Sequence, residues 1–346
     1  MLVVGAVLAA GGAAYPVMDH FGVFSDDGDP VAFSGGSAKD AGDAKARAAH
    51  PDGKGLMPTG PSAEFKVAAT VPQNGSKISV TTLHGAKSGF TGKVWVWTPP
   101  QYDEKANERK GFPVMVALPG GPGFQDNYWG SWPTFHNLEA KIDEWSKAGK
   151  SLPFILVMPV LNPQKDTGGL YWDGSDIPGQ PKMGTWLTQD VPDFARANFR
   201  TINGRDGWAF MGSSSGGFAG LKAVLKDPSR FKAVLAGGPD VAPDSPLWKG
   251  HDQEKAANDP GRLAEKLIAA NGPEVDLALQ VGTKEPKSTM DAVKGFAEKY
   301  GRGPVKVKFA VDQGGAHNAK DYVDNMDRTG LIQWLSEHLQ GPTPVA

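Results

Sequence analysis

The stretch from Trp208 to Leu221, WAFMGSSSGGFAGL, constrains the fold more than any other part of this chain. An apolar run ending at Met211 predicts a buried strand, and the apolar spacing after Gly216 predicts a helix. Between them lies G-x-S-x-G, with Ser214 at its centre. A sharp strand-to-helix turn exposes the serine hydroxyl, and glycines avoid collisions with the adjoining strand and helix. The pattern therefore predicts an α/β sheet with an exposed serine at the end of one strand.

The register of this turn decides which serine is the candidate nucleophile. Glycine accounts for 45 of the 346 residues, so G-x-S-x-G can also arise without a catalytic role. Only Ser214 has glycine two positions before and two positions after it, which makes Ser213 and Ser215 weaker candidates. The Ser215 amide would lie in the first turn of the helix, where N–H groups are unpaired and negative charge is favoured. We expect it to be an oxyanion donor.

Strands and helices alternate over most of the chain. An antiparallel hairpin is expected from the alternating segments 77–83 and 93–98. Beyond it, buried strands are predicted at 113–118, 154–158, 208–211, 231–236, 275–281 and 305–311. Helices are predicted at 185–199, with an interruption near its start at Pro192, and at 288–300 and 319–339. This alternation predicts a mainly parallel central sheet with helices on both faces.

Ligands of such sheets bind beyond the carboxyl ends of the strands, so the loops there hold the candidate site residues. The segment after Leu118 reads PGGPG. Its prolines have no N–H, so Gly121 is the preferred second oxyanion donor and Gly120 the next choice. No G-K-[ST] follows, which argues against a phosphate loop. The aromatic residues in FQDNYWGSW, just downstream, form either the wall of a substrate cleft or ordinary core packing.

Two further strand ends supply an acid and a base. Glu285 follows the strand 275–281, and Asp240 and Asp244 compete with it after the strand 231–236. Of the seven histidines, position selects His317, which lies between the strand 305–311 and a helix. The chain order Ser214, Glu285, His317 is the one expected for an α/β-hydrolase. In such a triad the imidazole takes the serine proton, and the carboxylate fixes its tautomer.

Composition excludes several other functions. The net charge is −2 and no block of lysine or arginine occurs, so nucleic acid is not an expected partner. Cysteine is absent, which excludes disulfides and thiolate metal sites. Neither H-E-x-x-H nor a cluster of histidine and aspartate appears, so we expect no metal and no cofactor.

The first 65 residues differ from the rest of the chain. Residues 1–18 carry no charge, although they lack the basic region of a signal peptide. They are a poor signal sequence, an anchor, the last part of a membrane span, or a buried core helix. We expect a segment 1–19 of this kind, a flexible polar linker over 20–65 and a folded domain over 66–346. This organisation favours a tethered extracytoplasmic protein, membrane-anchored or secreted.

From about residue 76 to 340 the chain resembles the putative esterase family of α/β-hydrolases, which includes esterase D, feruloyl esterases and actinobacterial mycolyltransferases. The motifs that carry the resemblance are KVWVWTPPQY, LPGGPG, WLTQDVP, GSSSGGFAG and LKDPSRFKAVLAGG. The resemblance implies Ser214 as nucleophile, Glu285 as acid, His317 as base, and the amides of Ser215 and Gly121 as the oxyanion hole. Many members have H-G-G-G or D-G-L at the LPGGPG loop. Mycolyltransferases place an arginine just after it, where Phe124 and Gln125 stand here. This departure argues against trehalose mycolate chemistry.

The sequence therefore predicts an extracytoplasmic serine esterase that cleaves carboxylic esters of small molecules, lipids or sugars through an acyl-serine intermediate. Two alternatives stay open. An acyltransferase of the mycolyltransferase type would use the same triad, with a sugar hydroxyl in place of water. A non-catalytic envelope-binding module with a hydrolase fold would need no triad.

Overall fold

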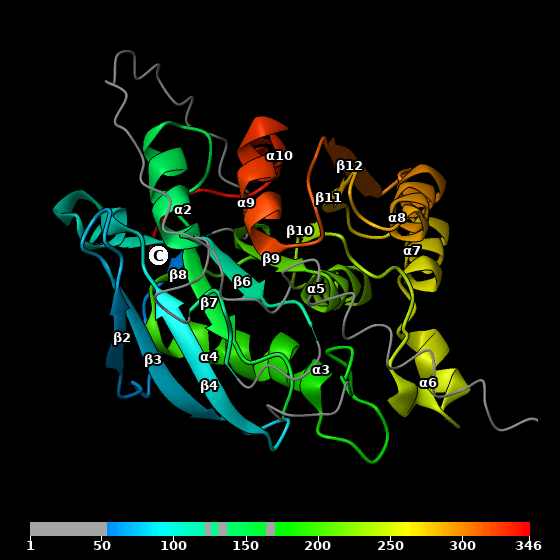
Figure 1. The fold of residues 1–346 in the computed structure, drawn as a ribbon. Coiled ribbons are helices and arrows are strands. Elements are labelled where there is room, and N and C mark those ends of the chain that lie inside the picture. Colours follow the sequence, from blue (N-terminus) through cyan, green and yellow to red (C-terminus); the bar gives the residue numbers. More distant parts are fainter. Residues whose placement is uncertain (1–53, 122–125, 131–136, 164–169) are drawn as a thin grey trace, which may run out of the picture.

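The computed structural model describes residues 54–121, 126–130, 137–163 and 170–346. In this part of the chain the main sheet has nine strands, in the order β12–β11–β10–β9–β6–β7–β4–β3–β2 (Figure 1). The predicted segments 1–19 and most of 20–65 lie outside the described residues. So do Phe124 and Gln125 after the glycine-rich loop, and Trp132 of the aromatic segment.

The six strands from β12 to β7 run parallel to one another. They are β6 (Val114–Leu118), β7 (Ile155–Pro159), β9 (Trp208–Ser213), β10 (Ala233–Gly237), β11 (Val275–Gly282) and β12 (Val305–Asp312). Every residue of β6, β7, β9, β10 and β11 is buried, as continuous apolar strands covered on both faces must be. The prediction of a mainly parallel sheet is confirmed.

The other edge of the sheet is antiparallel. It is formed by β2 (Lys66–Thr70), β3 (Lys77–His84) and β4 (Thr91–Trp97), and β4 joins β7 of the parallel part. The expected hairpin of residues 77–83 and 93–98 corresponds to β3 and β4. Strand β4 buries its last four residues, including Trp97, which is fully covered.

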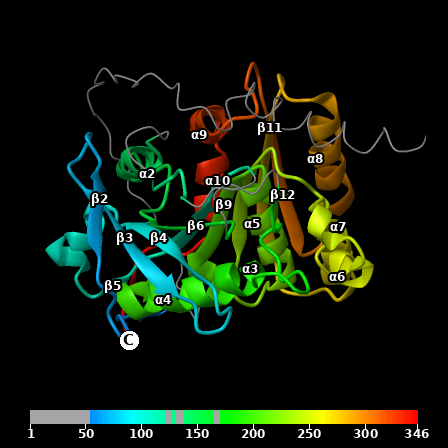
Figure 2. The same cartoon turned by 60° about the horizontal axis from the view of Figure 1, so that its bottom comes forward.

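Helices cover both faces of the sheet. They are α2 (Leu138–Lys147), α3 (Met183–Thr185), α4 (Val191–Asn198), α5 (Ser215–Lys226), α6 (Asp252–Ala257), α7 (Pro260–Ala269), α8 (Lys287–Tyr300), α9 (Ala319–Arg328) and α10 (Leu331–Glu337). Helices α2, α9 and α10 lie over one face, and α4 and α5 over the other (Figures 1 and 2). Within the ranges given above, no helix has the length and apolar character that a membrane span requires.

Two predicted helices are interrupted. The single helix expected over 319–339 is instead α9 and α10, because Gly330 adopts a left-handed conformation with φ of 65° and ends the first helix. The helix expected over 185–199 contains a π-helical turn, Trp186–Asp190, before α4 begins at Val191. The carboxylate of Asp190 accepts hydrogen bonds from the amides of Lys87 and Ser88 in the β3–β4 turn.

The folded part begins earlier than the boundary predicted at residue 65. Strand β1 (Gly55–Leu56) pairs with β8 (Thr201–Ile202), and the amides of Thr59 and Gly60 donate to the end of α4. Phe65 packs against two phenylalanines of the same region. A strand of two residues has no apolar period, so the sequence shows no signal for it. The end of the chain lies beside β1, because β13 (Thr343–Pro344) pairs with β5 (Lys110–Gly111) and Val345 bridges to Gly55.

Candidate active site

Ser214 lies between the end of β9 and the start of α5, in a strained backbone conformation. Its φ and ψ are 51° and −124°, a combination rare for a residue with a side chain. The Ser214 amide donates to the carbonyl of Gly237 at 2.8 Å, which ties the turn to the end of β10. Ser213 is the last residue of β9 and Ser215 the first of α5. Of the three serines, Ser214 therefore occupies the turn itself.

The glycines on either side of Ser214 are required by close backbone packing. A Cβ on Gly212 would lie 2.6 Å from the carbonyl oxygen of Gly216, in the helix. A Cβ on Gly216 would lie 2.6 Å from the carbonyl oxygen of Leu118, at the end of β6. These separations are shorter than carbon and oxygen atoms tolerate. On both sides of the turn a side chain in place of the glycine would thus collide with the backbone, as the sequence motif predicts.

Glu285 and His317 lie in contact at the ends of β11 and β12. Nδ1 of His317 is 2.8 Å from Oε2 of Glu285. A nitrogen that close to a carboxylate must carry the proton, which leaves Nε2 as the acceptor of the ring. The Glu285 side chain is fully buried, whereas 14% of the His317 side chain is exposed. The base can therefore be reached from the site, and the acid cannot.

The loops that carry this pair are fastened to each other. The Lys284 amide donates to the carbonyl of Gly315, and the Gly314 amide donates to Oγ1 of Thr283, both at 2.8 Å. Asn318 caps α9 directly after the histidine by accepting from the Asp321 amide. The imidazole is consequently held by two loops and a helix start.

Asp240 and Asp244 have a different environment. Among the described residues, neither has a hydrogen bond to the imidazole of His317. Burial, followed by the charge of Asp244, raises the pKa of Asp240, and the nearby His317 lowers it. Asp240 thus lies close enough for an electrostatic interaction with His317 but does not orient the imidazole through a hydrogen bond.

The amides of Gly121 and Ser215, expected to form the oxyanion hole, differ from the Gly120 amide in their hydrogen bonding. The Gly120 amide donates to the hydroxyl of Tyr128 at 3.0 Å, so it is occupied. Gly121 has φ of 77°, a conformation that suits glycine, and its amide has no hydrogen bond within the described part of the chain. Ser215 is at the first position of α5, and Ser214 provides no side-chain cap to the helix. The structure thus leaves the amides of Gly121 and Ser215 available.

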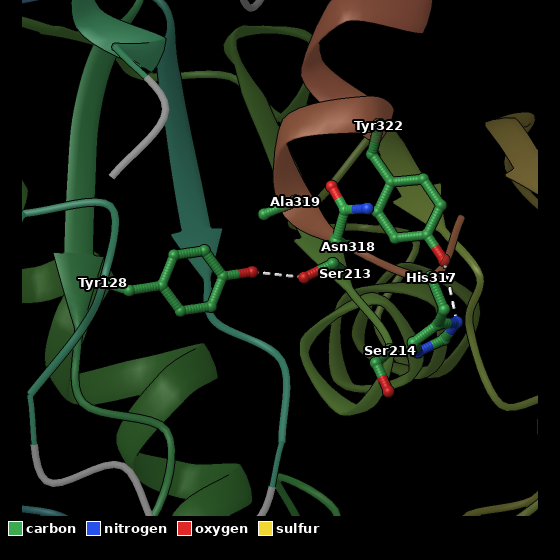
Figure 3. A pocket seen from close by; sticks show the side chains of 7 residues that line it. All are labelled: Tyr128, Ser213, Ser214, His317, Asn318, Ala319 and Tyr322. Atoms are coloured by element: carbon green, nitrogen blue, oxygen red, sulfur yellow. Dashed lines mark hydrogen bonds between the residues drawn. The ribbon is translucent and has the colours of Figure 1, made fainter. Parts of the chain in front are cut away.

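The aromatic segment after the loop contributes both to the core and to the site. Tyr128 and Trp129 are almost completely buried, and the Trp129 indole donates to the carbonyl of Leu118. The Tyr128 hydroxyl also makes a short hydrogen bond with the Ser213 side chain, which occupies that serine (Figure 3). A small pocket lies among these groups, lined by Tyr128, Ser213, Ser214, His317, Asn318, Ala319 and Tyr322.

The pocket brings Ser214 and His317 together on its wall. In the residues described, Ser214 Oγ has no hydrogen bond to the imidazole. In enzymes without substrate this contact is often long and tightens only in the reacting complex. The arrangement can therefore support nucleophilic attack by Ser214 with His317 as the base.

Tyr322 is a site residue that the sequence did not indicate. It lies on α9, five positions after the histidine, and its hydroxyl reaches both Glu285 and His317. The pair Gly237–Gly238 after β10 is a partial signal. A Cβ on Gly237 would lie 2.5 Å from the tyrosine ring, and one on Gly238 would meet Glu285 and His317 at 2.8 Å.

Comparison with protein families agrees with this geometry. The model of the family described as "Putative esterase" matches residues 89–325. The chain belongs to this family. The family is one of esterases, and the fold of this chain is the α/β-hydrolase fold.

Similar proteins show how far this conclusion extends. An uncharacterized protein of Corynebacterium glutamicum is 26% identical over 157 residues, which are 44% of this chain and 34% of that protein. The match therefore spans about a third of the length of that relative. A ferulic acid esterase structure covers 76% of this chain and 99% of its own, with a TM-score of 0.58 and 17% identity.

A structure of an S-formylglutathione hydrolase from Agrobacterium tumefaciens covers 81% of this chain and 100% of its own, with a TM-score of 0.58 and 18% identity. At such identities the likeness of the two structures establishes the fold alone. The substrates named for them are those of the other proteins.

Proposed function

We propose that this esterase hydrolyses carboxylic esters through an acyl intermediate on Ser214, with His317 as base and Glu285 as the acid that orients it. The observation that carries the proposal is the 2.8 Å contact between Glu285 and His317 at a pocket whose wall includes Ser214. The buried carboxylate keeps the proton on Nδ1, so Nε2 is free to accept the serine proton.

The reaction follows from these positions. Ser214 Oγ attacks the ester carbonyl while Nε2 of His317 takes its proton, and a tetrahedral intermediate forms. Collapse of the intermediate breaks the bond to the alcohol, which leaves with the proton from the imidazolium. Water, deprotonated by the same nitrogen, then attacks the acyl-serine and releases the carboxylic acid.

The negative oxygen of the intermediate needs donors that are already in place. The amide of Ser215, in the first turn of α5, is aimed by the helix, and its dipole favours negative charge. The amide of Gly121 supplies the second donor. Losing one such donor typically costs about 3 kcal/mol of transition-state stabilisation.

The proposed location is extracytoplasmic, with the enzyme either membrane-anchored or secreted. Its support is the uncharged segment 1–18 followed by polar sequence rich in glycine, alanine and aspartate. Fractionation of cells that express the whole chain, with protease added outside the cytoplasmic membrane, tests this. Protein that stays in the soluble cytoplasmic fraction and resists the protease would contradict the location.

A fluorophosphonate probe followed by peptide mapping tests the mechanism. We expect the label on Ser214, and loss of about a million-fold in turnover of a short p-nitrophenyl ester for Ser214→Ala. Ser213→Ala is the matched control, since its hydroxyl bonds to Tyr128 and it should keep the labelling. Labelling at another serine, or an active Ser214→Ala enzyme, would contradict the assignment. Analysis of the products with and without a sugar acceptor separates hydrolysis from acyl transfer.

A further inference from the structure

The strongest unassigned contact at the site involves the hydroxyl of Tyr322. This oxygen is 2.9 Å from Oε1 of Glu285 and 2.8 Å from Nδ1 of His317. The other carboxylate oxygen, Oε2, is 2.8 Å from the same Nδ1. The phenol therefore touches both members of the acid–base pair at once.

With Glu285 ionised, only one arrangement of protons satisfies all three distances. The carboxylate oxygen Oε2 can then only accept, so the proton lies on Nδ1 and the imidazole is the Nδ1–H tautomer. The phenol proton must then point to Oε1 of Glu285. The oxygen of Tyr322 is left as a second acceptor for the Nδ1–H group, so Tyr322 opposes the wrong tautomer together with Glu285.

The carboxylate of Glu285 depends on few donors. It is fully buried, and a buried charge is costly unless it is well hydrogen-bonded. In the described part of the chain its donors are the Gly282 amide at 2.5 Å, the Tyr322 hydroxyl and the imidazole. Burial and the Glu285 charge raise the pKa of Tyr322 well above its usual value, so the phenol keeps its proton and stays a donor.

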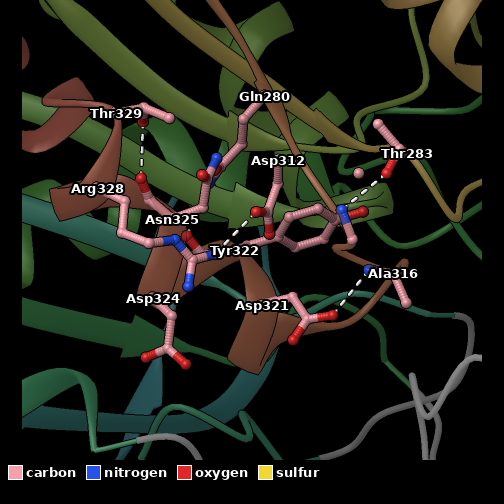
Figure 4. A network of polar contacts seen from close by, with 12 residues as sticks. Gln280, Thr283, Asp312, Ala316, Asp321, Tyr322, Asp324, Asn325, Arg328 and Thr329 are labelled. Carbon is pink, nitrogen blue, oxygen red and sulfur yellow. Dashed lines mark hydrogen bonds and ion pairs between the residues drawn. The ribbon is translucent and has the colours of Figure 1, made fainter.

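The surrounding structure holds the tyrosine in this position. Its backbone carbonyl accepts from Nε2 of Gln280 on β11 at 3.0 Å, and Gln280 accepts from Asn325 on the next turn of α9 at 2.7 Å (Figure 4). The ring occupies space that Gly237 and Gly238 leave free at the end of β10. Tyr322 is thus fixed from the strand side and from the helix side.

We infer that Tyr322 is a positioning residue of the catalytic site, which fixes the carboxylate of Glu285 and through it the tautomer of His317. This inference rests on the proposed triad. A hydrogen bond to a charged group corresponds to a factor of roughly 10 to 100 in an equilibrium. Tyr322→Phe, which keeps the ring and its packing, should lower kcat by roughly that factor and leave KM nearly unchanged.

A double-mutant cycle with Glu285→Gln tests the inference on the whole chain, with a short p-nitrophenyl ester as substrate. If Tyr322 acts through the carboxylate, Tyr322→Phe should cost less than about three-fold in the Glu285→Gln background. Tyr102→Phe is the matched control. The hydroxyl of Tyr102 is hydrogen-bonded too, since it accepts from the Arg200 amide, but Tyr102 is not among the residues that line the pocket. This variant should keep wild-type kcat.

Three outcomes would overturn the inference: wild-type kcat for Tyr322→Phe, the same loss in both backgrounds, or a loss confined to KM. An inactive Glu285→Gln with an unaffected Tyr322→Phe would contradict only the role of Tyr322. A fully active Glu285→Gln would contradict the proposed triad, and with it the role of the tyrosine.

Discussion

Gly238 provides a direct test of how tightly the acid and the base are held. It has φ of 50° at the end of β10, and a Cβ built there lies 2.8 Å from Oε2 of Glu285 and from Cε1 of His317. It would come still closer to the hydroxyl of Tyr322. Ordinary contacts of this kind begin near 3.4 Å, so each group must move by roughly 0.5 Å or more. Displacement of reacting groups by about 1 Å can cost 100-fold in rate.

For Gly238→Ala we therefore expect a 10- to 100-fold loss of kcat/KM, or about 1.4 to 2.7 kcal/mol in the barrier. The left-handed backbone adds about 1–2 kcal/mol of destabilisation for alanine. Gly250→Ala is the matched control, because Gly250 has φ of 84° with open space around its Cβ position. It should lose only the stability that the left-handed backbone accounts for, a few degrees of Tm, and no activity. Equal kcat/KM for the two variants, measured on purified enzyme, would refute the close packing of the pair.

Three other predictions concern the acid, the chain start and a buried glutamate. Glu285→Gln should lose at least about 100-fold in turnover, since amide replacement of a triad acid can cost about 10⁴-fold. Asp240→Asn should lose less than about ten-fold. If only the aspartate variant loses its activity, the triad acid is the residue after β10. A chain that starts at Glu64 lacks the β1–β8 pairing. Its free energy of unfolding should be at least about 2 kcal/mol lower than that of a chain starting at residue 54, while it stays active. Equal Tm values for the two chains would contradict this. Burial raises the pKa of Glu139 to about 8, above its unfolded value near 4.3. The contribution of Glu139 to the free energy of unfolding is therefore largest below about pH 4.3. It falls by at most about 1.4 kcal/mol per pH unit as the pH rises toward 8. Glu139→Gln should flatten this slope in denaturant titrations at several pH values, and an unchanged slope would contradict the assignment.

Much of the fold could be predicted because its central strands are short, apolar and separated by turns. The candidate site residues followed from the rule that loops at the carboxyl ends of parallel strands meet. That rule places Glu285 and His317 near each other without any knowledge of side-chain contacts. It could not choose decisively between Glu285 and Asp240, since both follow strands of the same sheet. The 2.8 Å contact with His317 separates them.

Other features depend on contacts that leave no local pattern. Tyr322 fits the buried face of α9 like any apolar residue, and only the fold shows where its hydroxyl points. Strand β1 is too short for a period, and its partner β8 is equally short. The break at Gly330 was hidden because the apolar residues of α9 and α10 continue across it. In each case the deciding interaction joins residues that are distant in sequence or depends on one backbone angle.

The two ends of the described chain lie on the side of the sheet opposite the candidate active site. β1 and β13 lie beside β5 and β8, which precede β6 and β9 and so mark the amino ends of these parallel strands. Ser214, Glu285 and His317 follow the opposite ends. The six residues of β9 set these two levels roughly 20 Å apart. If the enzyme is attached to a surface through its amino-terminal side, as proposed, the reactive serine faces away from the point of attachment. An enzyme fixed to a surface in this way would meet substrates that arrive from the surroundings more readily than those embedded beneath it.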